Sequence, residues 1–338
     1  MANIKDYKIA TLGSHSALQI LKGARDEGFS TICICQKDRV PTYKSFGVAD
    51  EIIEIEDIKD FFKLEERLLK ENVIIIPHGS FVEYLGHENL KKMKIMYYGT
   101  KEILQWESDR NQERIWLEKA GLRMPNIIPT PEEIDKPVII KFHGAGGGKD
   151  YFIANNTDEF YEGMHEYKHE KKYVIQEYIV GVPIYSHFFY SAVHDELEIM
   201  GFDKRYESNA DSIGRISAHD QMMTSIRTSY TICGNIPIVI RESLLPQMLE
   251  MGQKVVEESK KITNKGMLGP FCLEAIIDPN LNFYVFEISA RIVAGTNPYV
   301  HGSPYTWLKY DVPMSTGRRI ARDIKDAIKG NCLEKVLD

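Results

Sequence analysis

Short apolar runs alternate with amphipathic segments over the first part of the chain. Runs of this length, bounded by polar turns, are typical of buried strands, and the segments between them have the apolar period of a helix. We expect five strands there, at residues 8–12, 30–35, 51–55, 73–76 and 95–98. This alternation predicts an α/β lobe, with a parallel sheet covered by helices on both faces.

The pattern changes beyond residue 120. A predicted helix over residues 109–120 ends at Gly121, and three prolines between residues 125 and 131 then interrupt regular structure. The rest of the chain contains strands joined by short turns, with fewer helices between them, which is an α+β pattern. We expect three domains, over residues 1–123, 124–190 and 191–338.

Composition narrows the class of protein. The chain has 338 residues, of which 43% are hydrophobic, so it can bury a core spread over two or three lobes. Its 49 acidic and 42 basic residues give a net charge of −7, and we expect neither nucleic acid nor a membrane surface as a partner. No apolar run has the length of a membrane span, and the first residues lack the order of a signal peptide, so we expect a cytoplasmic protein.

Two loops of the predicted parallel sheet carry small and polar residues beyond the carboxyl ends of strands, where such sheets bind ligands. Residues 13–16 follow the first strand and open a helix, and residues 77–80 follow the fourth strand. A helix N-terminus offers free N–H groups and a favourable dipole to an anion such as a phosphate, and His15 is a further donor beside it. Ordinary capping of the helices by the serines is the alternative. The glycine spacing of a dinucleotide site is absent, which disfavours a hydride-transfer enzyme.

Two apolar runs near the C-terminus bracket a turn, and each run carries one glutamate. The turn residues 278–280 join strand-forming segments, and a connection over residues 279–282 places Glu274 opposite Glu287. Like charges that face each other at roughly 5 Å repel unless a cation lies between them. Magnesium accepts one or two carboxylates and completes its octahedron with water and phosphates, so the hairpin predicts a metal–nucleotide site. Two solvated glutamates on a strand are the alternative.

Two further segments are typical of nucleotide sites, although each is a weak signal alone. The strand that carries Lys141 is followed at residues 143–150 by a loop with four glycines in five positions, which lets the backbone approach phosphate oxygens. The loop is not a P-loop, because Asp150 replaces the hydroxyl residue and a strand follows. Residues 176–179 end a strand and can present backbone groups to an adenine edge. A flexible hairpin and an ordinary strand-to-turn junction are the alternatives.

The order of these parts resembles the ATP-grasp ligases, in which a Rossmann-like lobe precedes the grasp. A strand lysine, a glycine-rich hairpin, a Gln-Glu-Tyr-Ile linker and a two-glutamate hairpin follow one another. More closely, the chain is similar over its full length to the archaeal formate-dependent synthetases of 5-formaminoimidazole-4-carboxamide ribonucleotide (FAICAR). The strings that carry this resemblance lie at residues 13–17, 77–80, 205–209, 234–237, 241–246 and 286–297.

The resemblance implies an activity and a set of site residues. ATP would activate formate as formyl phosphate, and aminoimidazole carboxamide ribonucleotide (AICAR) would attack it, giving FAICAR, ADP and phosphate in purine biosynthesis. The cofactor would be Mg²⁺ or Mn²⁺, the substrates ATP, formate and AICAR, and the assembly a homo-oligomer. The resemblance assigns AICAR binding to His15, Ser80 and Asn235, ATP binding to Lys141, Glu177, Ile179 and Glu207, metal binding to Glu274 and Glu287, and catalysis to Lys141 and Arg291.

The chain departs from the general ATP-grasp pattern at two places. No carboxylate follows the linker at residues 181–185, where many of these enzymes bind ribose, and we expect Glu207 to replace it. The usual metal motif Glu-x-Asn-x-Arg has serine for asparagine at residues 287–291, which predicts one firmly held metal and a weaker or substrate-dependent second one. A turn residue at Asn235, a solvated charge at Glu207 and a structural ion pair at Arg291 are the local alternatives. For the whole chain, the alternatives are a related carboxylate–amine ligase with another acid or amine, and a nucleotide-binding sensor without catalysis.

Overall fold

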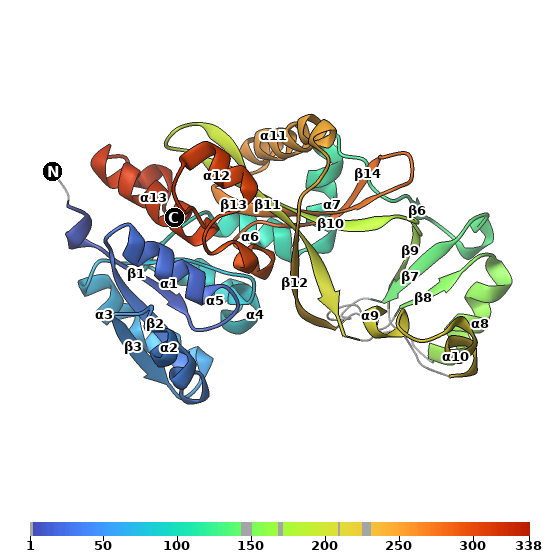
Figure 1. Ribbon diagram of the computed structural model, residues 1–338, viewed down its shortest axis with the longest axis horizontal. Coiled ribbons are helices and arrows are strands. Elements are labelled where there is room, and N and C mark those ends of the chain that lie inside the picture. Colours follow the sequence, from blue (N-terminus) through green and yellow to red (C-terminus); the bar gives the residue numbers. More distant parts are fainter. Residues whose placement is uncertain (1–2, 143–150, 168–171, 209, 225–230) are drawn as a thin grey trace.

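The computed structural model describes residues 3–142, 151–167, 172–208, 210–224 and 231–338, and its strands form three sheets (Figure 1). A five-stranded parallel sheet forms the N-terminal lobe, a five-stranded antiparallel sheet lies in the middle, and a four-stranded antiparallel sheet lies at the far end. The expected α/β lobe and α+β second half are therefore confirmed. None of the helices within the described ranges has the length and apolar character that a membrane span requires.

The N-terminal sheet is parallel throughout, with the order β3-β2-β1-β4-β5. Its strands are β1 (Lys8–Leu12), β2 (Ser30–Gln36), β3 (Glu51–Ile55), β4 (Val73–Ile75) and β5 (Met96–Tyr97). The helices that follow them are α1 (Ala17–Asp26), α2 (Val40–Phe46), α3 (Glu65–Lys70), α4 (Phe81–Leu85), α5 (His87–Lys92) and α6 (Lys101–Ser108). The strand order reverses between β1 and β4, so the loops after these two strands flank the crevice in which such sheets bind ligands.

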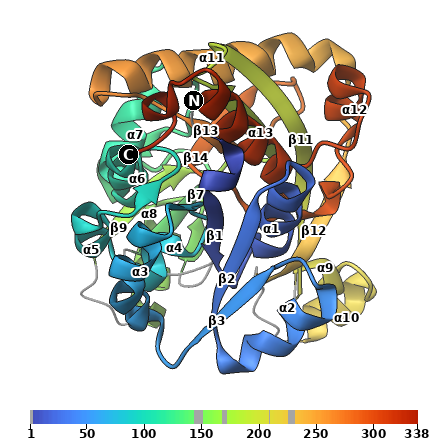
Figure 2. The same ribbon diagram turned by 90° about the vertical axis from the view of Figure 1, so that its left-hand side faces the viewer.

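Helices cover both faces of this sheet, and successive apolar residues of β2 point alternately into the two cores. Cys33 and Cys35 pack against α1 and α2, whereas Ile32 and Ile34 belong to the core under α3, α4 and α5. Figure 2 shows α13 (Thr316–Lys329) beside α1, and this contact joins the N-terminal lobe to the rest of the chain. The helices approach closely because a Cβ at Gly23 would overlap the backbone of α13.

The far sheet has the order β6-β9-β7-β8. Its strands are β6 (Ile127–Ile128), β7 (Val138–Phe142), β8 (Tyr151–Ala154) and β9 (Tyr173–Glu177), and α8 (Thr157–Tyr167) packs against it. β7 buries Val138, Ile140 and Phe142 in one core, so the alternation of the strand turns Lys141 to the opposite face. The predicted glycine-rich loop at residues 143–150 lies outside the described residues.

The central sheet has the order β12-β11-β10-β13-β14. Its strands are β10 (Val182–Ser191), β11 (Glu196–Glu207), β12 (Ile232–Ile238), β13 (Gly269–Ile277) and β14 (Phe283–Ser289). The other helices of this part are α7 (Arg110–Lys119), α9 (Ala210–Ile213), α10 (Ala218–Met223), α11 (Leu245–Ile262) and α12 (Pro304–Tyr310). Short 3-10 turns lie at Ile4–Asp6, Lys37–Arg39, Ile58–Leu64, Pro131–Glu133, Glu242–Leu244, Ala294–Tyr299 and Leu333–Lys335.

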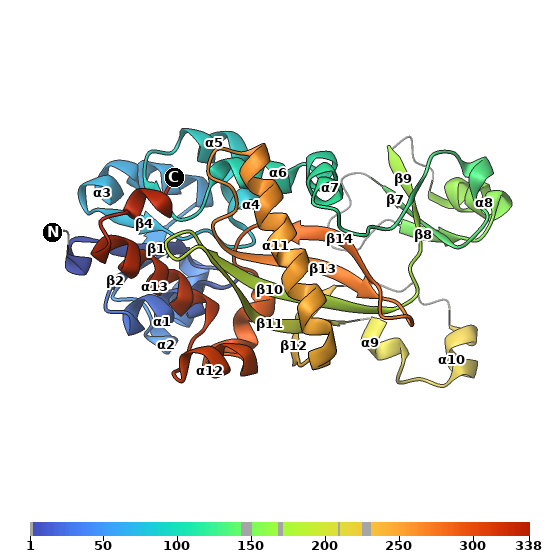
Figure 3. The same ribbon diagram turned by 90° about the horizontal axis from the view of Figure 1, so that it is seen from above.

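Helix α11 covers one face of the central sheet (Figure 3). Phe188 of β10 is buried against Met248 and Val255 in the largest core. Because side chains alternate along a strand, the residues next to Phe188 in β10 point to the other face of the sheet.

The pairing of β10 also affects the position of the second domain boundary. The expected boundary after residue 190 falls inside β10, which pairs with β11 and β13, so we propose instead a boundary in residues 178–181.

Candidate active site

The face of the central sheet turned away from α11 collects charged and polar side chains from all five strands. Directly opposed residues of a ladder point to the same face. The register opposes Asn235 to Arg205, Asp203 to Tyr185, Tyr185 to Glu274, and Glu274 to Glu287. Three residues that the sequence assigned to ligands, Asn235, Glu274 and Glu287, therefore share one face of the sheet with polar neighbours in the ladder.

In the hairpin of β13 and β14 the two predicted metal ligands face each other, but the turn and the strand register differ from the prediction. The connection spans residues 278–282, one residue more than predicted, because the Asp278 carboxylate accepts the backbone N–H of Asn282 at 2.9 Å. Ile277 rather than Asp278 then pairs with Phe283. A shift in register next to Glu274 offsets this change, so the prediction that Glu274 faces Glu287 is confirmed.

Glu274 is buried, and its two carboxylate oxygens have different surroundings. Oε1 accepts a hydrogen bond from Arg205 Nη2 at 2.5 Å, and the guanidinium carbon of Arg205 lies 4.0 Å from the centre of the Tyr185 ring. Oε2 is buried without a hydrogen-bond partner among the described residues. Burial, with Glu287 as the next cause, raises the pKa of Glu274 to about 8. An unpartnered buried carboxylate oxygen is costly, and a divalent cation would satisfy it.

Lys141 lies close to this hairpin, although it comes from the far sheet. Its Nζ is 5.8 Å from the centre of the Phe286 ring, beside Glu287 in the chain. Burial lowers the pKa of Lys141, and the charge of Glu287 acts in the opposite direction. Within the described ranges no group of three or more His, Cys, Asp or Glu side chains is placed to hold a metal. Among the described residues, a cation at this place would thus have the carboxylates of Glu274 and Glu287, and phosphate oxygens are ligands that would complete its coordination.

Two acids that sequence reasoning missed hold the outer edge of β14. Glu113 of α7 accepts the backbone N–H of Ile288 at 2.6 Å, and Glu107 of α6 accepts that of Ala290 at 2.9 Å. These carboxylates take the place of a further strand at the sheet edge. Burial, followed by the charge of Glu287, raises the pKa of Glu113 to about 9. Its signal in the sequence is an acid on the apolar stripe of α7, one turn before Trp116.

Arg291 forms an ion pair with Glu107 at 2.8 Å, and its side chain is largely buried. This contact is the structural ion pair that the sequence left open as an alternative. The expected catalytic role of Arg291 stays a prediction.

The two loops after β1 and β4 meet at a pair of stacked histidines. The rings of His15 and His78 are 5.7 Å apart and nearly parallel, and His15 has a φ of 51°. Gly79 lies against the His15 ring, and any Cβ there would overlap it. His15 is exposed on one side, and burial of the rest of the ring, followed by the charges of Arg291 and Arg205, lowers its pKa to about 4. His15 is therefore neutral at pH 7.

The serines of these loops do not serve as ordinary helix caps. Ser16 and Ser80 stand at the N-cap positions of α1 and α4, and neither side chain makes the capping hydrogen bond. Instead, the Ser14 Oγ lies 3.1 Å from the Tyr84 hydroxyl, to which Arg39 Nη2 donates at 3.5 Å. Burial raises the pKa of Tyr84, but hydrogen bonds with Ser14, Arg39 and Ser80 outweigh it and lower the pKa overall. Hydroxyl and guanidinium groups that suit an anion thus gather at this edge.

Asn235 lies within β12, so the interpretation of Asn235 as a turn residue is wrong. Its Nδ2 donates to Asp203 Oδ2 at 2.7 Å. The 3-10 segment Ala294–Tyr299, which comes after β14, contacts the loop after β1. Asn297 Nδ2 donates a hydrogen bond to the backbone oxygen of His15 at 3.1 Å. Because Gly295 of this segment also lies against Asp203, the partner of Asn235, the segment connects His15 with Asn235 across the two lobes.

The remaining predicted ATP contacts lie at the end of β9, in the linker after it and at the end of β11. The carboxylate of Glu177 accepts hydrogen bonds from Lys136 and Asn126, each at 2.7 Å, and its backbone N–H donates to the backbone oxygen of Asn126 at 2.8 Å, so the ATP contact expected of Glu177 stays a prediction. In the described part of the chain, the Ile179 N–H has no hydrogen-bond partner. Glu207 ends β11, where its backbone N–H donates to Asp211, and burial, then the charge of Asp211, raises the pKa of the Glu207 carboxyl.

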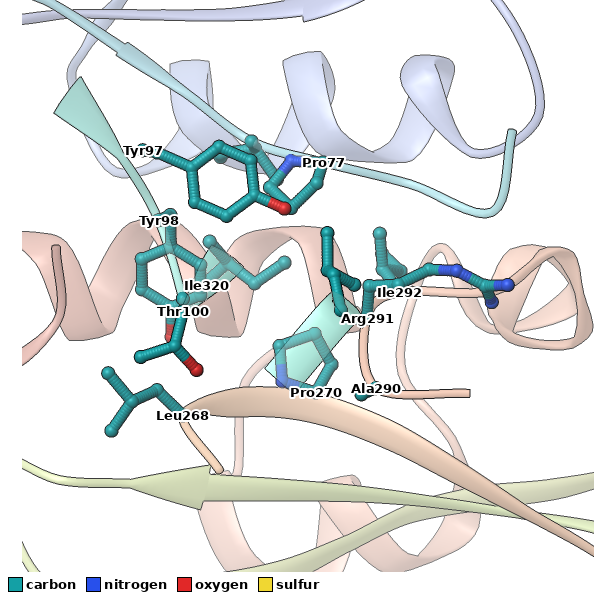
Figure 4. A pocket seen from close by; sticks show the side chains of 13 residues that line it. Pro77, Tyr97, Tyr98, Thr100, Leu268, Pro270, Ala290, Arg291, Ile292 and Ile320 are labelled. Atoms are coloured by element: carbon teal, nitrogen blue, oxygen red, sulfur yellow. The ribbon is translucent and has the colours of Figure 1, made fainter. Parts of the chain in front are cut away.

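A small cavity lies behind Arg291, between the N-terminal lobe and the central sheet. Figure 4 shows Tyr97 and Pro77 on one side of it and Pro270 and Ala290 on the other. The Tyr97 hydroxyl is buried without a partner among the described groups. The cavity has a volume of about 10 Å³, which suits one water molecule and excludes a nucleotide.

Two family models match the chain. One, described as a protein of unknown function (DUF1246), matches residues 9–128, and the other, described as a domain of unknown function (DUF1297), matches residues 153–338. Together they cover the N-terminal lobe, most of the far sheet and the whole central sheet.

Curated relatives match over nearly the full length. The 5-formaminoimidazole-4-carboxamide-1-(beta)-D-ribofuranosyl 5'-monophosphate synthetase of Thermococcus kodakarensis is 52% identical over 336 residues, which are 98% of this chain and 99% of the relative. The protein of the same name from Pyrococcus horikoshii is 53% identical over 338 residues, with the same shares of the two chains.

Solved structures agree with these relatives. The IMP biosynthesis protein PurP from Thermococcus kodakaraensis superposes with a TM-score of 0.78 at 30% identity, covering 98% of this chain and 100% of that protein. The N5-carboxyaminoimidazole synthetase of Staphylococcus aureus complexed with ADP has a TM-score of 0.60 at 18% identity, covering 87% and 74% of the two chains. The second likeness shows the shared fold only.

Proposed function

Because the chain belongs to the family of 5-formaminoimidazole-4-carboxamide ribonucleotide synthetases, which have the ATP-grasp fold, we propose that it formylates AICAR with ATP and formate. A formate oxygen attacks the γ-phosphorus of ATP, which releases ADP and gives formyl phosphate. The exocyclic amine of AICAR then attacks the formyl carbon, the carbon–oxygen bond to phosphate breaks, and the amine loses a proton. The products are FAICAR, ADP and phosphate.

The observation that carries this proposal is the unpartnered Oε2 of Glu274, directly opposite Glu287. Both carboxylates suit one Mg²⁺ or Mn²⁺, and the small number of ligands fits a metal that arrives with ATP. When bound, the metal would supply positive charge to the transferring phosphoryl group. Ser289 replaces the usual asparagine ligand of the motif, which supports one firmly held metal.

Other residues of the chain are proposed to bind and orient ATP. Lys141 faces the hairpin from the far sheet and is placed to offset negative charge on the same phosphates. The free N–H of Ile179, two residues after Glu177, is available to the adenine edge, and Glu207 is available to the ribose. These groups bind and orient ATP, and no covalent protein nucleophile is needed.

AICAR is proposed to bind across the crevice between His15 and Ser80 on one side and Asn235 on the other. Neutral His15 can donate one N–H without adding charge, and the hydroxyls around Tyr84 suit the phosphate of the ribonucleotide. This arrangement brings the amine of AICAR toward the phosphates held at the hairpin. By the same resemblance, we propose a cytoplasmic homo-oligomer.

Mass spectrometry of the products tests the proposal. Purified protein is incubated with ATP, Mg²⁺, formate and AICAR, and FAICAR and ADP should form together only when all four are present. Omission of formate, or its replacement by acetate, is the matched control. Turnover that needs another acid or amine would favour a related carboxylate–amine ligase, and binding of ATP and AICAR without turnover would favour a sensor.

A further inference from the structure

We infer that Asp203 and His187 are positioning residues that hold the Asn235 amide with its oxygen toward the substrate, so that the site selects a ribonucleotide with an N–H donor at this point. The inference rests on the proposed function only in taking AICAR as the ligand of Asn235. Neither Asp203 nor His187 touches the substrate in this proposal.

The three residues form a chain of hydrogen bonds across β10, β11 and β12. His187 Nε2 lies 2.7 Å from Asp203 Oδ1, and Asn235 Nδ2 lies 2.7 Å from Asp203 Oδ2. His187 and Asp203 are almost completely buried, whereas Asn235 is partly open to the crevice. This series of hydrogen bonds therefore runs from the buried His187 to the partly exposed Asn235.

The chemistry of a carboxylate fixes the direction of each bond. A carboxylate accepts hydrogen bonds, so the amide nitrogen of Asn235 and the N–H form of His187 Nε2 face Asp203. The amide oxygen of Asn235 is then turned away from Asp203 and can only accept. A serine or a water in place of Asp203 would leave the amide free to turn over.

Gly295 reinforces this arrangement from the segment that also reaches the His15 loop. A Cβ at Gly295 would overlap Asp203 Oδ1 and would lie 2.7 Å from His187 Nε2. The absence of a side chain there lets the backbone close over the Asp203 and His187 pair. Water is thereby kept from competing for the carboxylate oxygens.

The substrate has two groups that an acceptor at this position would select. AICAR carries N–H donors on its exocyclic amine and on its carboxamide. An analogue with a carboxylate for the carboxamide presents only acceptors there, and an analogue with hydrogen for the amine lacks that donor. A buried acceptor without its donor discriminates strongly against such an analogue.

Calorimetric affinities for AICAR and these two analogues test the inference without requiring turnover. In the Asp203→Asn variant the side chain at 203 can donate, so the Asn235 amide can reverse. We expect the affinity ratio of AICAR to one of the analogues to fall about tenfold, while ATP affinity stays unchanged. The analogue affected identifies the substrate group that Asn235 meets. Ratios unchanged for both analogues would overturn the inference.

A second pair of variants covers the case in which Asp203→Asn does not fold, which thermal unfolding would show. His187→Gln retains an N–H near the position of Nε2 and should keep the wild-type affinity ratios, whereas His187→Ala should lower them. Equal ratios in both variants would contradict the positioning role. Lys204→Gln, at an exposed position on the same strand, is the matched control. Failure of the proposed function would appear separately, as absence of FAICAR formation by the wild-type protein.

Discussion

Arg205 satisfies one carboxylate oxygen of Glu274, at 2.5 Å, and leaves the other oxygen buried without a partner among the described residues. The two residues are 69 positions apart in the chain. Their strands, β11 and β13, both pair with β10, and the two side chains meet across that strand. An ion pair that served stability alone would be expected to use both oxygens. The half-satisfied carboxylate therefore supports the proposal of a cation site at Glu274.

Loss of the exposed carboxylate of Glu287, a proposed metal ligand, should separate catalysis from ribonucleotide binding. We expect Glu287→Gln to lower kcat by at least about 10²-fold, because charge on the transferring phosphoryl group is no longer offset. AICAR affinity, measured by calorimetry, should change by less than about twofold, since the residues proposed to bind AICAR do not include Glu287. Glu257→Gln, on the exposed side of α11, is the matched control. An equal loss of AICAR affinity would contradict this division of roles.

The edge acid Glu113 offers a test of how β14 is held. Its raised pKa, about 9, means that it is protonated at pH 7, so neutral glutamine is a close substitute. We expect Glu113→Gln to keep kcat within about threefold, and Glu113→Ala to lower it by about 10²-fold as Glu287 loses its position. Steady-state kinetics of both variants measures this difference. Similar rates for the two variants would show that the Ile288 hydrogen bond does not position the hairpin.

Acid should destabilise the protein through the buried His78. Burial, followed by the charge of His15, lowers the pKa of His78 to about 3, and its Nε2 lies 3.0 Å from the backbone oxygen of Leu12. Because the folded pKa is below the unfolded value of 6.5, the unfolded state binds more protons between these values, and stability falls as pH decreases through this window. Between pH 6.5 and 4.5 the loss should be about 2 kcal/mol.

Urea unfolding at the two pH values measures this effect. His78→Gln removes the titrating group, and its free energy of unfolding should depend less on pH over the same range. A pH dependence equal to that of the wild type would show that other groups cause the loss.

The contact between Gly79 and His15 predicts a selective defect. In Gly79→Ala the new methyl group would displace the His15 ring, so we expect the KM for AICAR to rise about tenfold with little change in the KM for ATP. Gly214→Ala adds a methyl group where the nearest atom is 4.0 Å away, and it serves as the control. A parallel rise in both KM values would indicate a general disturbance of the fold.

Sequence patterns predicted those parts of the molecule that depend on local periodicity. The five parallel strands lie within one residue of their expected bounds, and the opposition of Glu274 and Glu287 was expected from the turn and the apolar runs. The register shift next to Glu274 was not expected, because the hydrogen bonds of Asp278 that lengthen the connection depend on side-chain geometry.

Contacts between residues far apart in the chain could not be predicted from the sequence, for a different reason. Glu107 and Glu113 meet β14 over separations of more than 170 residues, and no local pattern encodes such pairs. Arg205 entered the sequence analysis only as the first residue of the string at residues 205–209, without a partner. Its partner became evident once the order of the strands was known.

Formation of FAICAR from labelled formate tests the central claim most directly. With [¹⁸O₂]formate, ATP, Mg²⁺ and AICAR, transfer through formyl phosphate places one formate oxygen in the released phosphate and the other in the formyl group of FAICAR. Mass spectrometry of both products should therefore find one ¹⁸O in each. Phosphate without label, or ADP release without FAICAR, would contradict the proposed reaction.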